Sequence, residues 1–161
     1  MKKIHGLGSR ERLLLQIAVI LHGCGKYISL SDPADCSYQI IMATEIIGLS
    51  RKEREIIAYI VKFNTTEFPY YEELSRETDL DRSEYLTVAK LAAILRVANA
   101  CDRSHKQKFE NVKVSLKDKE LIIQVATSED ITLERGLFTE KAAFFEEVFS
   151  IRTSIHQKKH I

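Results

Sequence analysis

Apolar residues recur at helical spacing through the first two thirds of the chain. The run from Leu13 to Leu21 is almost entirely apolar, so we expect a helix that is buried on most sides, with Ser9 as its N-cap and Gly23 and Gly25 after its end. The pattern that follows predicts helices over 37–47, 50–63 and 83–102, a short amphipathic stretch over 70–77, and a loop over 26–36 that contains the helix breaker Pro33.

Two of these helices begin with the spacing of a capping box, in which two side chains three residues apart bond each other's backbone N–H groups. Ser50 and Glu53 form one such pair, and Asp81 and Glu84 form the other. Gly48 stands where the helix over 37–47 needs a C-terminal cap. The apolar positions expected in the core of the last helix are Leu86, Ala89, Leu91, Ala93, Ile94 and Val97.

The pattern changes after Lys108. Apolar and polar residues alternate over 112–116, and a more apolar strand over 121–125 follows a polar turn, so the pair predicts a β-hairpin. A helix over 132–150, with its phenylalanines in the core, and a closing strand over 151–156 complete the prediction. The fold class is therefore mainly α, with a helical body at 1–108 and a small ββαβ appendage of the α+β kind at 109–161.

Composition restricts the possible partners. The chain has 161 residues, of which 45% are hydrophobic and 29% charged, with a net charge of +1. A nearly neutral chain has no overall attraction to nucleic acid or to a membrane, so an anion site has to be a local patch. We find no apolar run of transmembrane length.

The three cysteines, Cys24, Cys36 and Cys101, form no CxxC pair. This suggests free thiols in a cytoplasmic protein, and a thiolate zinc site is the alternative.

The most informative chemical feature is His22 at the end of the first apolar helix. A His-Asp pair there would supply a metal with an imidazole nitrogen and a charged oxygen. Gly23 has no such oxygen, and Asn99, in the long helix, offers only a neutral one. We interpret His22 and Asn99 as a degenerate metal site that holds no metal. The structural interpretation of His22 is a helix-terminal side chain that hydrogen-bonds a nearby carbonyl.

Four segments appear in the order found in one known family. They are HGLGSRERLLLQIAVILHGCGKYI (5–28), SYQIIMATEIIGLSRKEREIIAYIVKF (37–63), LAAILRVANACDRSH (91–105) and FFEEVFSIR (144–152). Over roughly 5–157 the chain resembles the C-terminal region of the exopolyphosphatase / guanosine pentaphosphate phosphatase (Ppx/GppA) family.

The resemblance implies an HD-like helical bundle followed by a small α+β domain. It also implies that an N-terminal pair of actin-like nucleotide-fold domains carries out catalysis, with a divalent cation such as Mg²⁺, in a bacterial, cytoplasmic homodimer. The chain contains neither catalytic domain and begins after the helix expected before His5, so we expect a fragment or a truncated product that holds no cofactor itself.

The chain departs from the family pattern at several ligand-type or basic positions. His22-Gly23 replaces a common His-Asp pair, residues 33–36 replace a histidine-rich segment, residues 63–66 replace an aromatic-His-Arg-Lys run, and Ala98-Asn99 replaces Ala-Asp. The run Asp102-Arg103-Ser104-His105 is retained. A metal held by one histidine and neutral oxygens would bind poorly.

Phosphate groups are the other ligand that the resemblance suggests. Arginine is the natural bidentate clamp for phosphate, and spaced cations neutralise the successive charges of a phosphate chain. The alternative is a solvated surface of balanced charge, with the cations after Asp102 suited to the negative end of a helix. The candidate phosphate-binding residues are Lys26, Lys62, Arg96, Arg103, His105 and Lys106, with Lys108 as a further member of a basic channel.

We therefore expect a non-catalytic C-terminal domain of a Ppx/GppA-type exopolyphosphatase. It would assist in binding polyphosphate, weakly when alone, and in dimerisation, with the N-terminal catalytic domains as further partners and no nucleic acid or membrane. No catalytic residue is assigned. A stand-alone HD-type metal-dependent phosphohydrolase and a purely regulatory or dimerisation module remain alternatives. The pair Tyr70-Tyr71 is a candidate partner surface.

Overall fold

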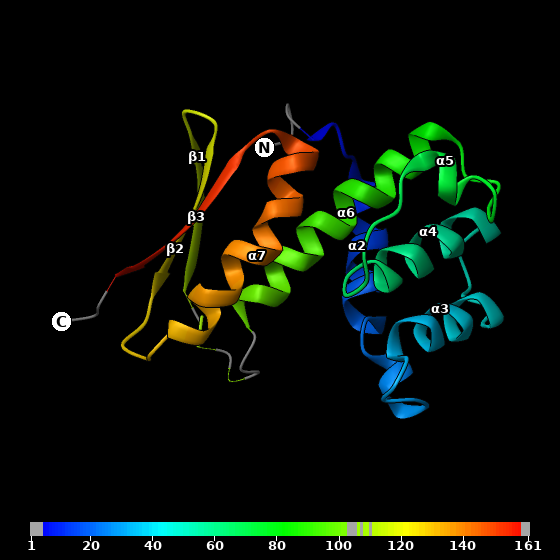
Figure 1. Ribbon diagram of the computed structural model, residues 1–161, viewed down its shortest axis with the longest axis horizontal. Coiled ribbons are helices and arrows are strands. Elements are labelled where there is room, and N and C mark those ends of the chain that lie inside the picture. Colours follow the sequence, from blue (N-terminus) through cyan, green and yellow to red (C-terminus); the bar gives the residue numbers. More distant parts are fainter. Residues whose placement is uncertain (1–4, 103–105, 107, 110, 159–161) are drawn as a thin grey trace. The chain divides into compact units, whose positions relative to one another are not determined.

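The computed structural model describes residues 5–102, 106, 108–109 and 111–158. Two compact units can be distinguished: Gly6–Leu95, called the first unit, and Arg96 to the end of the described chain, called the second unit. The mainly helical fold with a small sheet confirms the predicted fold class, whereas the division at 108/109 stays a prediction. No described helix is long and apolar enough to cross a membrane. The elements in chain order are α2 (Ser9–Leu21), the 3₁₀ helix η1 (Cys24–Tyr27), α3 (Pro33–Ala43), α4 (Arg51–Lys62), α5 (Tyr71–Leu74), α6 (Arg82–Cys101), β1 (Val112–Lys117), β2 (Glu120–Ala126), α7 (Thr132–Phe149) and β3 (Arg152–Lys158) (Figure 1).

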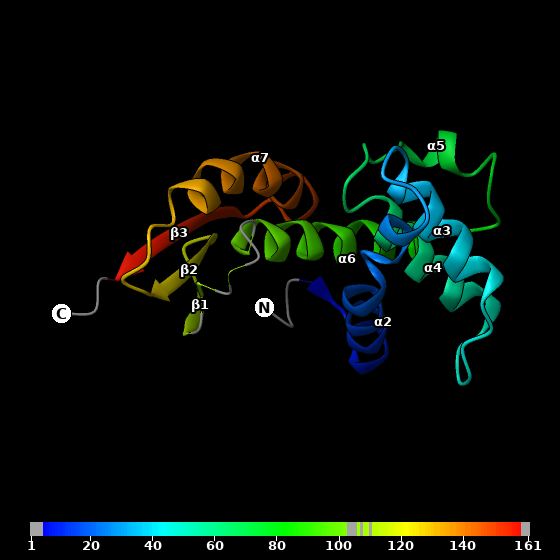
Figure 2. The same ribbon diagram turned by 90° about the horizontal axis from the view of Figure 1, so that it is seen from below.

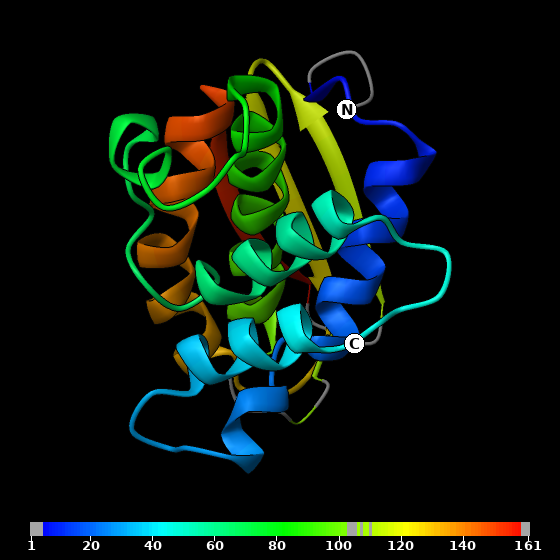
Figure 3. The same cartoon turned by 90° about the vertical axis from the view of Figure 1, so that its right-hand side faces the viewer.

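Helix α4 is the centre of the first unit. Residues 56–61 are all buried, so burial extends around the whole helix and is not limited to one face. Helices α2 and α3 both pack against α4, and Figure 3 shows α3 and α4 side by side. A helix that is buried all round needs neighbours on every side. Its packing therefore fixes the arrangement of the helices that surround it.

A row of aromatic rings extends the core of the first unit from α4. The ring centroids of Tyr38 and Tyr59 are 4.9 Å apart, those of Tyr59 and Phe63 are 5.4 Å apart, and those of Phe63 and Phe68 are 5.0 Å apart. The ring centroid of Phe68 in turn lies 5.3 Å from that of Tyr85 on α6. Tilted and stacked pairs of this kind each contribute about 0.5–1.5 kcal/mol beyond the burial of their area. Burial also raises the pKa of Tyr59, so its hydroxyl stays protonated.

Both predicted capping boxes are confirmed. The Ser50 backbone N–H donates to Glu53 Oε2 at 2.8 Å, and the Glu53 N–H donates back to Ser50 Oγ at 3.2 Å. Asp81 and Glu84 exchange the equivalent bonds, each at 2.8 Å. Glu53 also accepts a hydrogen bond from the Arg10 guanidinium. The hydrogen bonds from Arg10 and from the Ser50 N–H together lower the pKa of Glu53 to about 2.

Two predicted helix starts are wrong. Helix α3 covers 33–43 and not 37–47, because Asp32 is its N-cap and accepts a hydrogen bond from the Asp35 N–H at 3.2 Å. Pro33 was expected to break a helix but occupies the first position of this one, where its fixed φ angle suits the helix and its missing N–H is not needed. Helix α2 begins at Ser9 with Gly8, and not Ser9, as its N-cap.

The expectation that the first apolar helix is buried on most sides is also wrong. Leu14 and Ala18 of α2 are buried, but Val19 is 45% exposed and Ile20 is 79% exposed. Leu86, expected in the core of α6, is 53% exposed. An apolar run shows that a helix can be buried, but the neighbours that the fold supplies decide which of its sides are covered.

Gly25 brings the turn after α2 into direct contact with the start of α3. The Gly25 N–H donates to Ser37 Oγ at 2.9 Å, and this hydroxyl donates to the Pro33 carbonyl at 2.8 Å. Ser37 is buried. A Cβ atom at Gly25 would lie 2.1 Å from the Pro33 carbonyl oxygen, whereas a Cβ at Gly23 would meet nothing within 4 Å. Only a glycine at position 25 permits this approach.

The second unit contains a three-stranded sheet of order β1-β2-β3. Strand β1 is antiparallel to β2, and β3 is parallel to β2, to which it is joined through α7, as the predicted ββαβ order requires. Helix α7 lies along one face of the sheet (Figure 2). The large buried apolar side chains of this layer are Leu121, Ile123 and Val125 of β2 and Phe138, Phe145 and Phe149 of α7. The predicted phenylalanine core is therefore confirmed for these three rings, whereas Phe144 is only half-buried.

A buried ion pair fixes the start of α7. Lys108 Nζ lies 3.2 Å from Glu134 Oε2, and the two side chains are 13% and 1% exposed. Lys108 also donates to the carbonyl of Asp130 at 2.5 Å. Removing one partner of such a pair would leave an unpaired buried charge, so Lys108 has a structural role in the second unit.

We predict that Gly25→Ala destabilises the protein by about 1–3 kcal/mol, because the backbone of α3 has to move away from the new methyl group. The matched variant Gly23→Ala should change stability by no more than about 0.5 kcal/mol. Urea unfolding followed by circular dichroism measures both. Equal midpoints for the two variants would show that the close approach at Gly25 does not contribute to stability.

Candidate functional site

His22 ends helix α2 as its C-cap. Its Nδ1–H donates to the carbonyl of Val19 at 2.6 Å, which is the hydrogen bond that the structural interpretation requires. Asn99 is half-buried in the last turn of α6. His22 belongs to the first unit and Asn99 to the second. The interpretation of the two as a degenerate metal site stays a prediction.

Of the three cysteines, Cys101 shows little of the character of a metal ligand. All three are free and partly buried. Burial raises the pKa of Cys101 to about 11, so its thiol stays protonated at neutral pH, whereas zinc binds the thiolate. Within the described ranges, no group of three or more His, Cys, Asp or Glu side chains could hold a metal ion. The resemblance assigns the divalent cation to the catalytic domains of the parent protein, and the expectation that this chain holds no cofactor stays a prediction.

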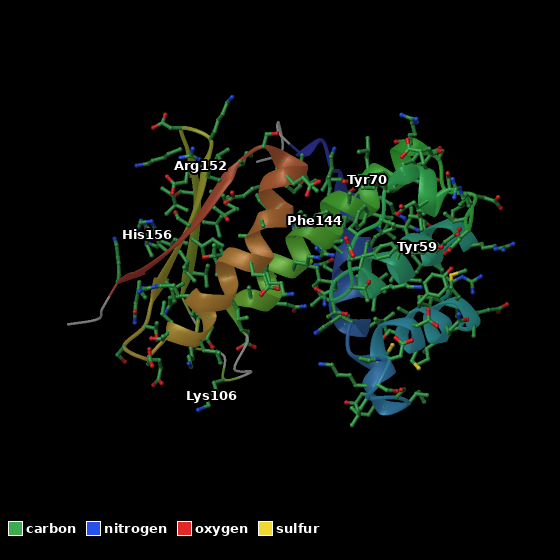
Figure 4. The ribbon with its side chains drawn as sticks, in the orientation of Figure 1. Tyr59, Tyr70, Lys106, Phe144, Arg152 and His156 are labelled. Carbon is green, nitrogen blue, oxygen red and sulfur yellow. The ribbon has the colours of Figure 1, made fainter. Side chains whose placement is uncertain are left out.

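Two of the predicted phosphate-binding residues are engaged by neighbours. Lys62 Nζ lies 3.0 Å from Asp35 Oδ1 and 5.2 Å from the centre of the Tyr38 ring. The centre of the Phe144 ring on α7, which is labelled in Figure 4, lies 4.3 Å from the guanidinium carbon of Arg96. Burial lowers the pKa of Arg96, against the opposing effect of the Glu147 carboxylate. Both cations contribute to packing in their own unit.

The remaining candidates are separated along the chain. Lys26 is exposed on η1 in the first unit, and Lys106 is exposed in the second. Arg103 and His105 lie outside the described residues. Lys108, the further member of the predicted basic channel, is held by Glu134. That the six candidates bind phosphate stays a prediction.

Helix α7 leaves one face of the sheet uncovered, and none of the residues on that face was a sequence candidate. Along β2, residues 121, 123 and 125 are buried on the face of the sheet that α7 covers. Their partners in register on β1 and β3 share that face. Thr153 is one such partner, and its Oγ1–H donates to Glu146 on α7. The alternate residues form the open sheet face, and none of them is buried. They are Lys113, Ser115 and Lys117 of β1, Glu120, Ile122, Gln124 and Ala126 of β2, and Arg152, Ser154, His156 and Lys158 of β3.

The open sheet face carries a local excess of positive charge. Lys113, Lys117, Arg152 and Lys158 oppose one carboxylate, Glu120. None of these four cations takes part in an ion pair with another described residue. The alternation of apolar with polar residues over 112–117 was visible in the sequence. Only the register across three strands shows that the cations share one face.

The comparison with models of protein families agrees with the resemblance. A search of curated proteins found none that matches the chain. The family model of the Ppx/GppA phosphatase, domain III, matches residues 2–141. This match covers most of both units, including the helices of the first and the β1-β2 hairpin of the second. The chain therefore belongs to the Ppx/GppA phosphatase family, in which it corresponds to domain III.

Proposed function

We propose that this chain is a non-catalytic domain of an exopolyphosphatase of the Ppx/GppA family, where it helps to bind polyphosphate and forms a homodimer. The family match supports the link to phosphatase chemistry. The resemblance assigns catalysis to two other domains, which leaves binding and assembly to this one. In this proposal the parent enzyme is cytoplasmic and hydrolyses phosphoanhydride bonds, and the present chain does not.

The observation that carries the proposal is an exposed apolar surface on the first unit. Between residues 19 and 30, Ile20 is 79% exposed, Tyr27 91%, Ile28 72% and Leu30 85%. These residues lie at the end of α2, in η1 and in the turn that follows. Neighbouring exposed apolar side chains are typical of a surface that another protein covers. An assembly role explains why large side chains are left in solvent here.

A second copy of this chain is the partner that best fits this surface. Lys26 is the only Lys, Arg, Asp or Glu between residues 19 and 30, so two copies could meet there with little repulsion between like charges. The net charge of the whole chain is only +1, so the electrostatic repulsion between two copies is also weak. A symmetric dimer brings the same patch of each copy together. We call residues 19–30 the α2–η1 surface.

We expect light scattering over a dilution series to show a dimer that dissociates as the chain is diluted. The double variant Ile20→Asp/Ile28→Asp should raise the dissociation constant at least about tenfold, because it places charges in an apolar interface. Ile47→Asp is the matched control, since Ile47 is 101% exposed but lies outside the α2–η1 surface. A monomer at all concentrations, or equal effects of the two changes, would contradict the proposed interface.

We expect calorimetric titration of the chain with polyphosphate to show weak binding at low salt. No orthophosphate should be released from the polymer in the presence of Mg²⁺, because the chain supplies a binding surface only. No binding at low salt would contradict the polyphosphate role. Release of orthophosphate, together with one tightly bound divalent ion per chain, would instead support the stand-alone phosphohydrolase.

A further inference from the structure

We propose that the open sheet face of the second unit binds the phosphate polymer. This inference rests on the proposed function, because it names the surface on which that binding takes place. The surface lies on the side of the sheet away from α7, and its members come from all three strands. Figure 4 labels two of them, Arg152 and His156, on β3.

The register places the cations in two groups. Lys117, Glu120 and Arg152 lie in one row across the sheet, so that a carboxylate stands between two cations. Further along the strands, Lys113 and His156 flank Gln124 in a second row, with Lys158 one position beyond them on the open face. A row of uncharged residues, Ser115, Ile122 and Ser154, separates the two groups.

The separation of the two groups favours a polymer as the ligand. Lys117 and Lys113 are four residues apart on one strand, which corresponds to about 13 Å at the usual rise of a β-strand. One orthophosphate ion cannot contact both groups, whereas a chain of linked phosphates lying along the strands can. Neutralising several successive phosphates releases counterions, and this gives a polyanion its affinity for spaced cations.

The open sheet face offers few groups on which the bases of a single-stranded nucleic acid could stack, since His156 is its one aromatic ring. Sheets that bind single strands stack the bases on aromatic side chains. None of the residues of this face is Phe, Tyr or Trp, and its middle row holds Ser115, Ile122 and Ser154. The face therefore fits a phosphate chain without bases.

The cations of the open sheet face are also more available than the earlier candidates. Lys62 is paired with Asp35 and Arg96 is stacked on Phe144, so an anion would have to displace those contacts. Lys113, Lys117, Arg152 and Lys158 are exposed, and none is in an ion pair with a described residue. A polymer can approach them without breaking existing contacts.

The test compares variants that remove two charges from opposite sides of the second unit. Lys113→Gln/Arg152→Gln changes the open sheet face, and Arg135→Gln/Lys141→Gln is the matched control on α7. The salt dependence of polyanion binding grows with the number of cations that contact the phosphates. If all four cations of the face are engaged, the affinity of the unmodified chain for polyphosphate should fall about fifty-fold between 50 and 200 mM salt. The sheet-face variant should bind more weakly at low salt and lose only about sevenfold over the same range. The control should keep the steep salt dependence.

A third variant gives a gain that misfolding cannot imitate. Glu120→Gln removes the carboxylate between Lys117 and Arg152, so it should strengthen polyphosphate binding about twofold to fivefold. Orthophosphate at the same total phosphate concentration should compete poorly, because it cannot bridge the two groups.

The outcomes separate the inference from the proposed function. If the unmodified chain binds polyphosphate but the sheet-face and control variants lose affinity equally, this inference is wrong and the proposed function stands. If the unmodified chain does not bind at low salt, both are wrong. If single-stranded DNA of matched charge binds as tightly and is equally weakened by the sheet-face variant, the assignment to a chain without bases is overturned.

Discussion

The second unit depends on one constraint: a single helix can cover only one face of its three-stranded sheet. Because side chains alternate between the faces of a strand, the burial of Leu121, Ile123 and Val125 against α7 determines which residues remain in solvent. Polar residues at the alternate positions are not part of the core under α7, so their side chains can contact a ligand. The excess of lysine and arginine there, in a chain with a net charge of only +1, is therefore informative.

The first unit is organised differently, around α4. Its six consecutive buried residues require neighbours on every side, and α2, α3 and the aromatic row from Tyr38 to Tyr85 supply them. The buried residues of helix α2 are Leu14 and Ala18, whereas Ile20 lies in solvent. The contact of Gly25 with α3 fixes the turn that carries the exposed side chains of η1. A rigid core thus presents an apolar outer surface, which suits assembly with another protein.

Local signals in the sequence predicted the fold well. The capping boxes at Ser50 and Asp81 could be predicted because each involves only four neighbouring residues. Pro33 was misinterpreted because proline suits both a loop and the first position of a helix, and only the capping hydrogen bond of Asp32 distinguishes them. The exposure of Ile20 could not be predicted, since it depends on which helices the tertiary fold places beside α2.

The candidate site was harder to predict than the fold. The sequence candidates were single cations spread from Lys26 to Lys106, and the structure shows Lys62 and Arg96 engaged in packing contacts. The cations of the open sheet face lie on strands that are separated by α7 in the sequence, so only strand register brings Lys113 and His156 into one row. Long-range pairing of this kind is not visible in a single sequence.

Nuclear magnetic resonance of the ¹⁵N-labelled chain during titration with polyphosphate tests the central claim most directly. Shifts concentrated on β1 and β3, at Lys113, Lys117, Arg152 and Lys158, with Arg135 and Lys141 of α7 unaffected, are the predicted result. Shifts confined to the surroundings of Lys26 and Lys62, or spread evenly over both units, would contradict it.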